Sequence, residues 1–160
     1  ELFKSFKEFP ELFLIIKKHP SGSLEDNEIN KIADKLNFKN YIISRDMDIC
    51  NLINASFAII TRQSNMGLEG MILGKYIIIM DTYFDTNDYF EYTKFNAALY
   101  AKKPGELKKA LKSLIENKKL QEKLQNNIKK FISYNYSVND GNSSERMAKL
   151  IQEITQKPYK

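Results

Sequence analysis

Two polar stretches directly after apolar runs contain the residues whose types and spacing suit chemistry on an anion. One is the segment 61–65 (TRQSN), which separates the apolar run Phe57–Ile60 from a short predicted helix. A turn between the carboxyl end of a strand and the amino end of a helix offers free backbone N–H groups and a helix dipole, and both favour an anion. The sequence therefore predicts a phosphate-binding turn here.

Residues of this turn and of the following helix have distinct expected roles. Ser64 and Asn65 are good N-cap residues, and Gly67 lets the backbone approach a phosphate closely. We expect Glu69 in the first helical turn, where its carboxylate can accept hydrogen bonds from a ribose diol. An ordinary capped strand–helix connection has the same local pattern, because short glycine-containing turns are weak motifs.

The other stretch is 17–20 (KKHP), which follows the apolar run Leu12–Ile16. His19 and Pro20 belong to it, and His19 is the only histidine of the chain. Strand side chains alternate, so only one of Lys17 and Lys18 can face a site at this strand end. Ligands of open α/β sheets bind at the carboxyl edge, which predicts that this stretch and the turn at 61–65 share one cleft.

Further candidates lie at the ends of two other predicted strands. Ser44 and Arg45 follow Tyr41–Ile43. Asp81 follows Tyr76–Met80 and is the best local carboxylate, with helix capping as its expected role. A surface charge remains an equally good interpretation of Arg45 and Arg62.

Several kinds of site lack the residues they need. No second histidine, cysteine or carboxylate stands at metal-ligand spacing from His19, so we expect no metal ion. Neither a G-x-S-x-G elbow nor a Walker A sequence is present. No cofactor is expected.

Short apolar runs alternate with amphipathic helical patterns along the chain, which predicts an α/β fold: one Rossmann-like parallel sheet with helices on both faces. The predicted strands are Leu12–Ile16, Tyr41–Ile43, Phe57–Ile60, Tyr76–Met80 and Ala97–Tyr100. Predicted helices include 2–9, 25–36 capped by Ser23, 47–54 capped by Asp46, one starting at Pro104, 118–133, and a terminal helix at 142–157. We expect residues 1–160 to form a single nucleotide-sugar-binding domain.

Composition fits a globular protein: 42% of the 160 residues are hydrophobic and 28% are charged. No apolar run approaches the roughly 20 residues that span a bilayer. The single cysteine, Cys50, fits a reducing, cytoplasmic compartment, and its apolar neighbours predict a small buried side chain. Because the chain starts at Glu1 and no strand precedes the first helix, we expect a fragment of a longer protein.

Positive charge is concentrated in one segment. The chain has a net charge of +5, yet residues 102–130 hold ten lysines and three glutamates, which gives that segment 10 − 3 = +7. A lysine-rich helical face is usually just solvated. Peripheral contact between an anionic membrane and the helices at 104–133 is the alternative, and no nucleic-acid partner is expected.

The central segment resembles the donor-nucleotide segment of GT-B glycosyltransferases, whose usual form is S-S-x-G-x-E-A-x-x-L-G-K-P-V-I. The positions that match this form are Ser64, Gly67, Glu69, Leu73, Gly74 and Lys75. Asn65 stands where Ser, Gly or Thr is commoner, Gly70 where Ala is usual, and Tyr76 where Pro is usual.

Two further motifs resemble one GT-B subgroup, which includes bacterial sialyltransferases, capsule Kdo transferases and CDP-glycerol glycerophosphotransferases. The K-x-H-P sequence at 17–20 is similar to the HP motif that lines the nucleotide pocket there, often for CMP or CDP. The stretch 140–147 is similar to the D-G-x-x-x-E-R-I entry to the terminal helix, with Met147 in place of Ile. The three motifs occur in the family's order and cover most of the chain.

The resemblance implies transfer of a sugar or polyol phosphate from a CMP-, CDP- or UDP-activated donor to a surface polysaccharide or related acceptor. Lys17 or Lys18 would be the cationic help at the phosphate, with Arg62 as the second choice. His19, Ser44 and Arg45 would border the base or the phosphate. No Asp or Glu is a persuasive general base, and the catalytic residues are expected in an amino-terminal Rossmann-like domain. This fragment would then be inactive alone. A non-catalytic nucleotide- or polyanion-binding module and the carboxyl half of a UDP-sugar 2-epimerase are the alternatives.

Overall fold

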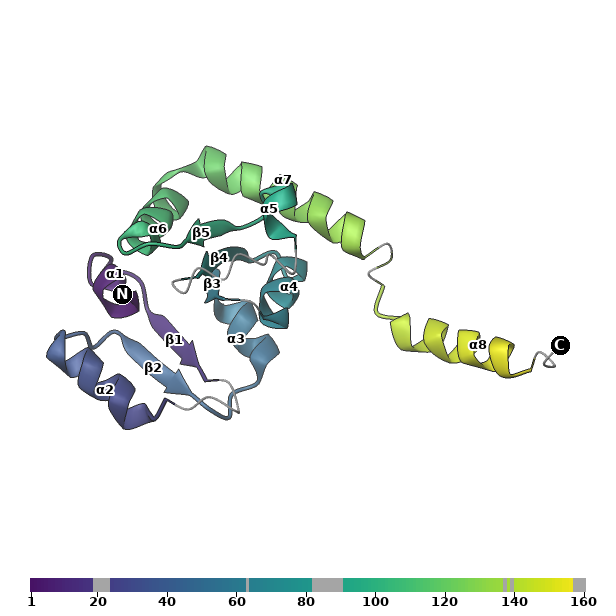
Figure 1. Cartoon of the computed structure of the whole chain (residues 1–160), viewed down its shortest axis with the longest axis horizontal. Coiled ribbons are helices and arrows are strands. Elements are labelled where there is room, and N and C mark those ends of the chain that lie inside the picture. The colour runs from purple at the N-terminus through teal and green to yellow at the C-terminus, as the bar shows by residue number, and fades with distance from the viewer. Residues whose placement is uncertain (19–23, 63, 82–90, 137, 139, 157–160) are drawn as a thin grey trace.

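The computed structural model describes residues 1–18, 24–62, 64–81, 91–136, 138 and 140–156, and within them it is an α/β fold with short parallel strands (Figure 1). This confirms the predicted fold class. The strands, each within two residues of its predicted run, are β1 Leu14–Lys17, β2 Tyr41–Ser44, β3 Ala58–Thr61, β4 Tyr76–Met80 and β5 Leu99–Ala101.

Hydrogen bonds divide these strands into two sheets, and the expectation of one continuous sheet is therefore wrong. β1 pairs with β2, and β4 lies between β3 and β5; every described pair is parallel. β1 and β3 contribute side chains to one apolar cluster without sharing a ladder, so side-chain packing joins the sheets. The apolar pattern places each strand but does not specify which strand edges pair.

Helices connect the strands in the order typical of such folds. Their bounds are α1 Leu2–Phe6, α2 Asp26–Lys35, α3 Ile49–Ala55, α4 Asn65–Ile72, α5 Tyr92–Phe95, α6 Glu106–Glu116, α7 Lys118–Asn135 and α8 Ser143–Thr155. The sequence pattern did not predict α5.

The β3–β5 sheet is buried on both faces, because alternate residues of β4 enter different apolar clusters. Ile78 packs with residues of α1, α2 and α6, whereas Ile77 and Ile79 pack with residues of α3, α4 and α5. α7 reaches both clusters through Leu124 and Ile128. This two-sided burial explains the uninterrupted apolar sequence of β4.

Caps at the starts of two helices differ from the predicted ones. α2 is capped by Glu25, whose N–H donates to the Glu28 carboxylate at 2.9 Å; the expected cap, Ser23, lies outside the described residues. α3 is capped by Asp48, which accepts from the Asn51 N–H at 3.0 Å, and not by Asp46. Two aspartates two residues apart cannot be distinguished by cap propensity alone.

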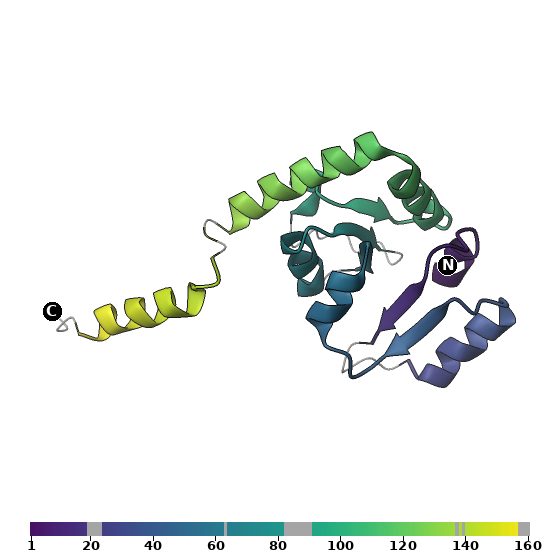
Figure 2. The same cartoon turned by 180° about the vertical axis from the view of Figure 1, so that it is seen from behind.

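α8 extends away from the body of the molecule, and none of its residues is buried (Figures 1 and 2). Its entry is fixed by Asp140, which accepts from Arg146 Nη1 with both carboxylate oxygens, at 2.7 and 2.9 Å, and from the Asn142 N–H. This contact between Asp140 and Arg146 gives a structural reason for the first and last residues of the D-G-x-x-x-E-R pattern. The hydrogen bond from Arg146, first among several causes, also lowers the pKa of Asp140.

Two further findings concern composition. Cys50 is exposed on α3, so the expected burial of its side chain is wrong; Leu52 and Ile53 form the buried side of that helix. Among the described residues, no helix is both long and apolar enough to cross a bilayer.

Candidate functional site

The amino terminus of α4 directly follows β3, as expected for the phosphate-binding turn. Ser64 is the N-cap, with extended φ and ψ of −150° and 143°, and its Oγ accepts from the Met66 N–H at 3.2 Å. The Gly67 N–H donates to the Ser64 carbonyl oxygen at 2.9 Å. A phosphate here must therefore compete with Ser64 for two of the N–H groups expected to hold it.

Gly67 is buried, and a buried tyrosine hydroxyl occupies the space beside it. A Cβ atom added to Gly67 would lie 2.9 Å from Tyr92 Oη and 3.4 Å from Thr61 Cγ2. Tyr92 itself is 2% exposed and packs against the Phe131 ring of α7. The glycine is thus required for packing of α5 on α4, a role that sequence reasoning missed.

Glu69 lies in the second turn of α4, because the helix begins at Asn65; the expected first-turn position is wrong. Asn65 and Glu69 are both exposed. Within the described part of the chain, no hydrogen bond or ion pair engages the Glu69 carboxylate, so its predicted contact with a ribose diol stays a prediction.

Arg62 and Asp81 form an ion pair beside the same turn. Arg62 follows β3 and Asp81 follows β4, and Arg62 Nε lies 3.6 Å from Asp81 Oδ1. The carboxylate is 7% exposed, whereas the guanidinium is 47% exposed. Asp81 also extends the ladder, since its N–H donates to the Ala101 oxygen at 3.1 Å. Asp81 is therefore an internal charge partner of Arg62. Whether it also caps a helix stays a prediction, because residues 82–90 lie outside the described residues.

A second set of predicted residues lies at the carboxyl ends of β1 and β2. The cations of this set already bind other groups of the chain. The Lys17 ammonium donates to the backbone oxygens of Arg45 and Met47. Lys18 Nζ lies 2.9 Å from Asp26 Oδ1, and Arg45 Nη2 lies 2.8 Å from Asp26 Oδ2. Asp26 thus neutralises two of the cations that the sequence assigned to a phosphate.

This cluster also affects proton binding. Hydrogen bonds from Arg45 first and from Lys18 second hold the pKa of Asp26 below its usual range. The same Asp26 hydrogen bond raises the pKa of the Arg45 guanidinium. The carboxylate is therefore charged throughout the neutral range, and the cluster is an internal salt bridge.

Ser44 is buried between these groups, at 4% exposure, and its Oγ has no hydrogen-bond partner among the described residues. It stands opposite Lys17 in the β1–β2 register. His19 and Pro20 lie outside the described residues, so whether they share a cleft with Ser64 stays a prediction.

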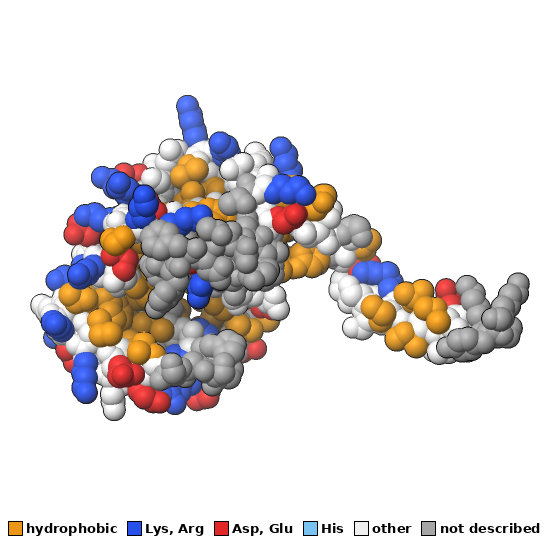
Figure 3. All heavy atoms as spheres, in the orientation of Figure 1, with side chains coloured by type: hydrophobic (Ala, Val, Ile, Leu, Met, Phe, Trp, Pro, Cys, Tyr) orange, Lys and Arg blue, Asp and Glu red, His pale blue; other side chains and the backbone are white. Residues whose placement is uncertain are grey.

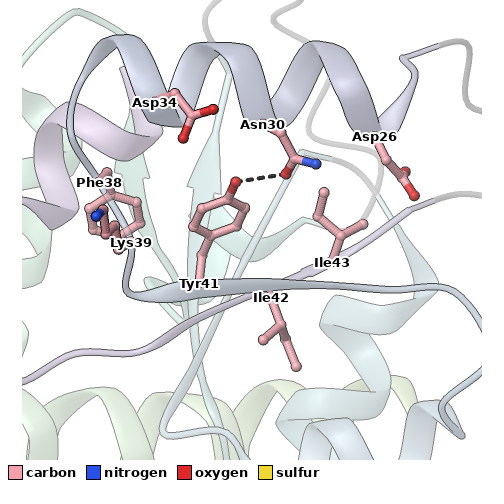
Figure 4. Close-up of a pocket in the computed structure, with 8 residues that line it drawn as sticks. All are labelled: Asp26, Asn30, Asp34, Phe38, Lys39, Tyr41, Ile42 and Ile43. Carbon is pink, nitrogen blue, oxygen red and sulfur yellow. Dashed lines mark hydrogen bonds between the residues drawn. The ribbon is translucent and has the colours of Figure 1, made fainter.

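A surface groove lies between α2 and the edge strand β2, away from the α4 turn (Figure 4). Tyr41 Oη donates to Asn30 Oδ1 across it at 2.7 Å, and Ile42 points to the opposite side of the strand. Its lining residues include two carboxylates, Asp26 and Asp34, and one cation, Lys39. This lining disfavours a phosphate, and the groove contains none of the predicted site residues.

Sequence reasoning did not foresee the roles of Asp26, Asp81 and Tyr92. A strand-end position drew attention to Asp81, but the buried pair with Arg62 depends on the β3–β4 register. Tyr92 follows a stretch without helical or strand periodicity, so no local signal marked it. Within the described residues, no group of three or more His, Cys, Asp and Glu side chains could hold a metal ion.

Comparison with known proteins gives one finding. A family model described as CDP-Glycerol:Poly(glycerophosphate) glycerophosphotransferase matches residues 2–153. Neither the curated proteins nor the solved structures contain a match to the chain. Because the matched range covers nearly all 160 residues, the chain belongs to the CDP-glycerol:poly(glycerophosphate) glycerophosphotransferase family, a family of transferases.

Proposed function

We propose that this chain is the donor-binding domain of a GT-B-type transferase and binds the phosphates of CDP-glycerol, or of a closely related nucleotide-activated donor, at the amino terminus of α4. The observation that carries the proposal is the capped start of α4 at the carboxyl end of β3, with Arg62 beside it. Helix N-termini in this position stabilise anions through backbone N–H groups and the helix dipole.

The family match supports this assignment more than the alternatives. A glycerophosphotransferase breaks a phosphoanhydride bond and leaves a nucleoside monophosphate, so it must stabilise negative charge on the leaving phosphate. A cationic side chain at a helix N-terminus meets that need. The match gives no support to the 2-epimerase interpretation, and a module without catalytic partners would not require a chain that follows the transferase model over 2–153.

The acid–base group of the reaction is proposed to lie in another domain. Asp81 is buried against Arg62, and Asp26 is held by Lys18 and Arg45, so neither carboxylate is free to take a proton from an acceptor hydroxyl. An amino-terminal Rossmann-like domain would supply the base, bind the polymer acceptor and close over the donor. The isolated chain is then expected to bind nucleotide weakly and to catalyse no transfer.

Titration followed by two-dimensional ¹⁵N NMR tests the site. CDP-glycerol, CDP and CMP should shift the backbone signals of Ser64, Asn65 and Gly67, and UDP and ADP should bind less tightly than CDP. Unchanged signals at 64–69 with every nucleotide would contradict the assignment. Signals that move instead along α2 would relocate the site to the groove beside β2.

Matched variants separate binding from stability. Ser64→Ala and Asn117→Ala each remove a side-chain cap, since Asn117 Oδ1 accepts from the Leu120 N–H at 3.0 Å at the start of α7. Each should lower stability by about 1 kcal/mol. Only Ser64→Ala should also change CDP affinity, and by less than that, because the backbone supplies most donors.

Glu69→Ala tests the ribose contact. It should weaken CDP binding by about 1–3 kcal/mol if its carboxylate accepts from the ribose hydroxyls. Glu153→Ala removes an exposed glutamate on α8, far from α4 in the sequence. It is the control and should leave CDP affinity unchanged. Equal CDP affinity of the Glu69→Ala variant and the wild type would remove Glu69 from the site.

A second candidate function is peripheral attachment to an anionic membrane through α6 and α7. Lysine side chains project where these helices lie (Figure 3), and all ten lysines of 102–130 are exposed. Each lysine near an anionic surface contributes about 1 kcal/mol, and salt screens the attraction over about 8 Å. An ordinary solvated face explains the same exposure.

Sedimentation with lipid vesicles distinguishes the two explanations. Anionic vesicles should retain the chain at low salt, whereas neutral vesicles should not. Replacing Lys108, Lys109, Lys112 and Lys119 by Gln should abolish the retention. Equal partitioning into both lipids, or retention that survives the replacements, would leave these lysines as solvent-facing residues.

A further inference from the structure

A second surface groove lies at the amino-terminal edge of the β3–β5 sheet, between the start of β4 and the first half of α7. Its volume is about 430 Å³, within the range of roughly 300–1,000 Å³ that ligand pockets have. The residues that line it are Tyr76, Lys118, Gln121, Glu122, Gln125 and Asn126. Tyr76 is the first residue of β4, whereas the α4 turn follows the last residue of β3. The groove and the proposed donor site therefore lie at opposite edges of the sheet.

Two glutamines of α7 are held in the groove through their amide nitrogens. Gln125 Nε2 donates to the Gly74 oxygen at 2.8 Å, and Gln121 Nε2 donates to the Leu114 oxygen at 2.7 Å. Residues four apart lie on one face of a helix, so the two amides are neighbours. Each keeps a carbonyl oxygen with two lone pairs and a second N–H. The pair thus offers acceptors and donors in an orientation that the backbone contacts fix.

An aromatic pair adjoins these amides. Tyr76 is partly buried, and its ring centroid lies 5.3 Å from that of Phe57. Phe57 is 50% exposed, although it directly precedes β3. Within the described part of the chain, no hydrogen bond engages the Tyr76 hydroxyl. An apolar ring surface and a hydroxyl that can both donate and accept are therefore available together.

The charges of the groove nearly cancel. Lys118 and Glu122 are both exposed and lie one helical turn apart. A groove with one charge of each sign disfavours a ligand that is held by charge alone. The ammonium of Lys118 suits a single phosphate as a point charge, and the Glu122 carboxylate accepts hydrogen bonds from hydroxyls. The lining as a whole fits a ligand that carries both hydroxyl and phosphate groups.

We propose that this groove is a second binding site, which takes a segment of a polyol phosphate chain, a polymer of hydroxyl-bearing units joined by phosphodiesters. Tyr76, Gln121 and Gln125 bind its hydroxyl and ester oxygens, and Lys118 binds one phosphodiester. The carbon chain packs on the exposed ring of Phe57. Binding here does not require a nucleotide at α4.

A polymer held at this edge has a functional consequence. Attachment at one site raises the effective concentration of the rest of the chain around a second site on the same molecule. The groove would thus keep a polymer near the donor while its reacting end is free to enter and leave. Only this consequence rests on the proposed function; the groove itself goes beyond it.

Titration of the whole ¹⁵N-labelled chain with short oligomers of glycerol phosphate tests the site. The side-chain NH₂ signals of Gln121 and Gln125 and the backbone signals of 118–126 should shift, and those of 64–67 should not. Glycerol, which has hydroxyls but no charge, and inorganic polyphosphate, which has charge but no hydroxyls, should each bind about tenfold more weakly, because each loses one class of contact.

Conservative variants identify the contacts. Tyr76→Phe should weaken oligomer binding by about threefold or more without lowering the melting temperature, because the hydroxyl has no partner within the described residues. Tyr136→Phe, at another partly exposed tyrosine next to the end of α7, is its control. Lys118→Gln should cause a similar loss and a weaker dependence on salt. Lys123→Gln, on the same helix but outside the groove, should change neither.

The outcomes that overturn this inference differ from those that overturn the donor site. Oligomers that leave the signals of 118–126 unmoved, or that bind Tyr76→Phe as tightly as the wild type, contradict the groove. Polyphosphate that binds as well as the oligomer, or an equal loss in Lys118→Gln and Lys123→Gln, would show attraction to lysines in general. Absence of CDP binding at 64–67 contradicts the proposed function alone, because the oligomer titration needs no nucleotide.

Discussion

The carboxyl ends of β1–β2 and of β3–β4 show two outcomes for the same kinds of residue. At β1–β2, Asp26 satisfies Lys18 and Arg45 from the start of α2, and backbone oxygens satisfy Lys17. At β3–β4, a buried carboxylate faces a half-exposed arginine beside a helix cap that carries no charge. Strand-end cations alone thus do not identify a phosphate site; we expect the sign of the charge at the following helix N-terminus to separate the two strand ends.

The first turn of each following helix makes that difference concrete. α2 begins with acidic residues, Asp26 and Glu28, which interact favourably with the helix dipole and disfavour an anion there. α4 has no acidic residue in its first turn. The dipole of α4 is therefore available to a ligand, whereas that of α2 already stabilises the chain's own carboxylates.

The largest expected effect is steric, and it tests how tightly the α4 turn of the β3–β4 end is packed. Gly67→Ala should lower the free energy of unfolding by about 1–3 kcal/mol, because the new Cβ would lie 2.9 Å from Tyr92 Oη. Tyr92→Phe in the same chain should restore much of that loss by removing the hydroxyl. Urea unfolding curves measure both. If Tyr92→Phe gives no rescue, the packing role of Gly67 is wrong.

The next effect is acid sensitivity, which belongs to the β1–β2 end. The pKa of Asp26 is lower in the folded chain than in the unfolded one, so its contribution is present above the unfolded value of about 3.9 and is lost as the pH falls through the folded value. Asp26→Asn should therefore be less stable than the wild type at neutral pH. The difference in the free energy of unfolding between the two proteins should shrink as the pH falls below about 4.

Thermal melting between neutral pH and about pH 3 checks this expectation. Glu153→Gln, an exposed carboxylate on α8, serves as the control and should show no such narrowing. A constant gap between Asp26→Asn and the wild type would mean that the lost packing, and not the charge, lowers the stability. CDP affinity should be unchanged in Asp26→Asn.

The smallest expected effect is a nearly unchanged CDP affinity, which would support the difference between the two strand ends. Arg45→Gln should leave CDP affinity within twofold or so of the wild type, because Arg45 is engaged by Asp26 and not by the donor. NMR titration of Arg45→Gln beside Arg62→Gln measures the difference. A large loss in the Arg45 variant would mean that the Asp26 cluster opens on binding.

Much of this organisation follows from local sequence. Periodicity places α6 and α7 and their buried residues, such as Leu107, Leu114 and Phe131, because an amphipathic helix has one apolar face whatever it packs on. Cap propensity identified Ser64 and Asn65 as candidates for the same local reason, and Ser64 is the cap. The start of α4 and the family resemblance were therefore accessible without a structure.

What the sequence did not predict depends on residues distant in the chain. Lys18 and Arg45 are cations in any local window; only the pairing of β1 with β2 brings both to Asp26. Gly67 fits a phosphate motif equally well, and only the return of Tyr92 shows its steric role. Likewise, Met147 and Ile151 have core-like spacing, yet both are exposed.

That exposure of α8 has a consequence for how cooperatively the chain unfolds. Its large apolar side chains, seen along the arm in Figure 3, are exposed, so apolar burial against the rest of the described chain adds little to its internal hydrogen bonds. Helices of this length are marginal in isolation. Amide hydrogens of α8 should consequently exchange with solvent through local fraying. Those of α7, which contributes to both apolar clusters, should exchange only when the core unfolds.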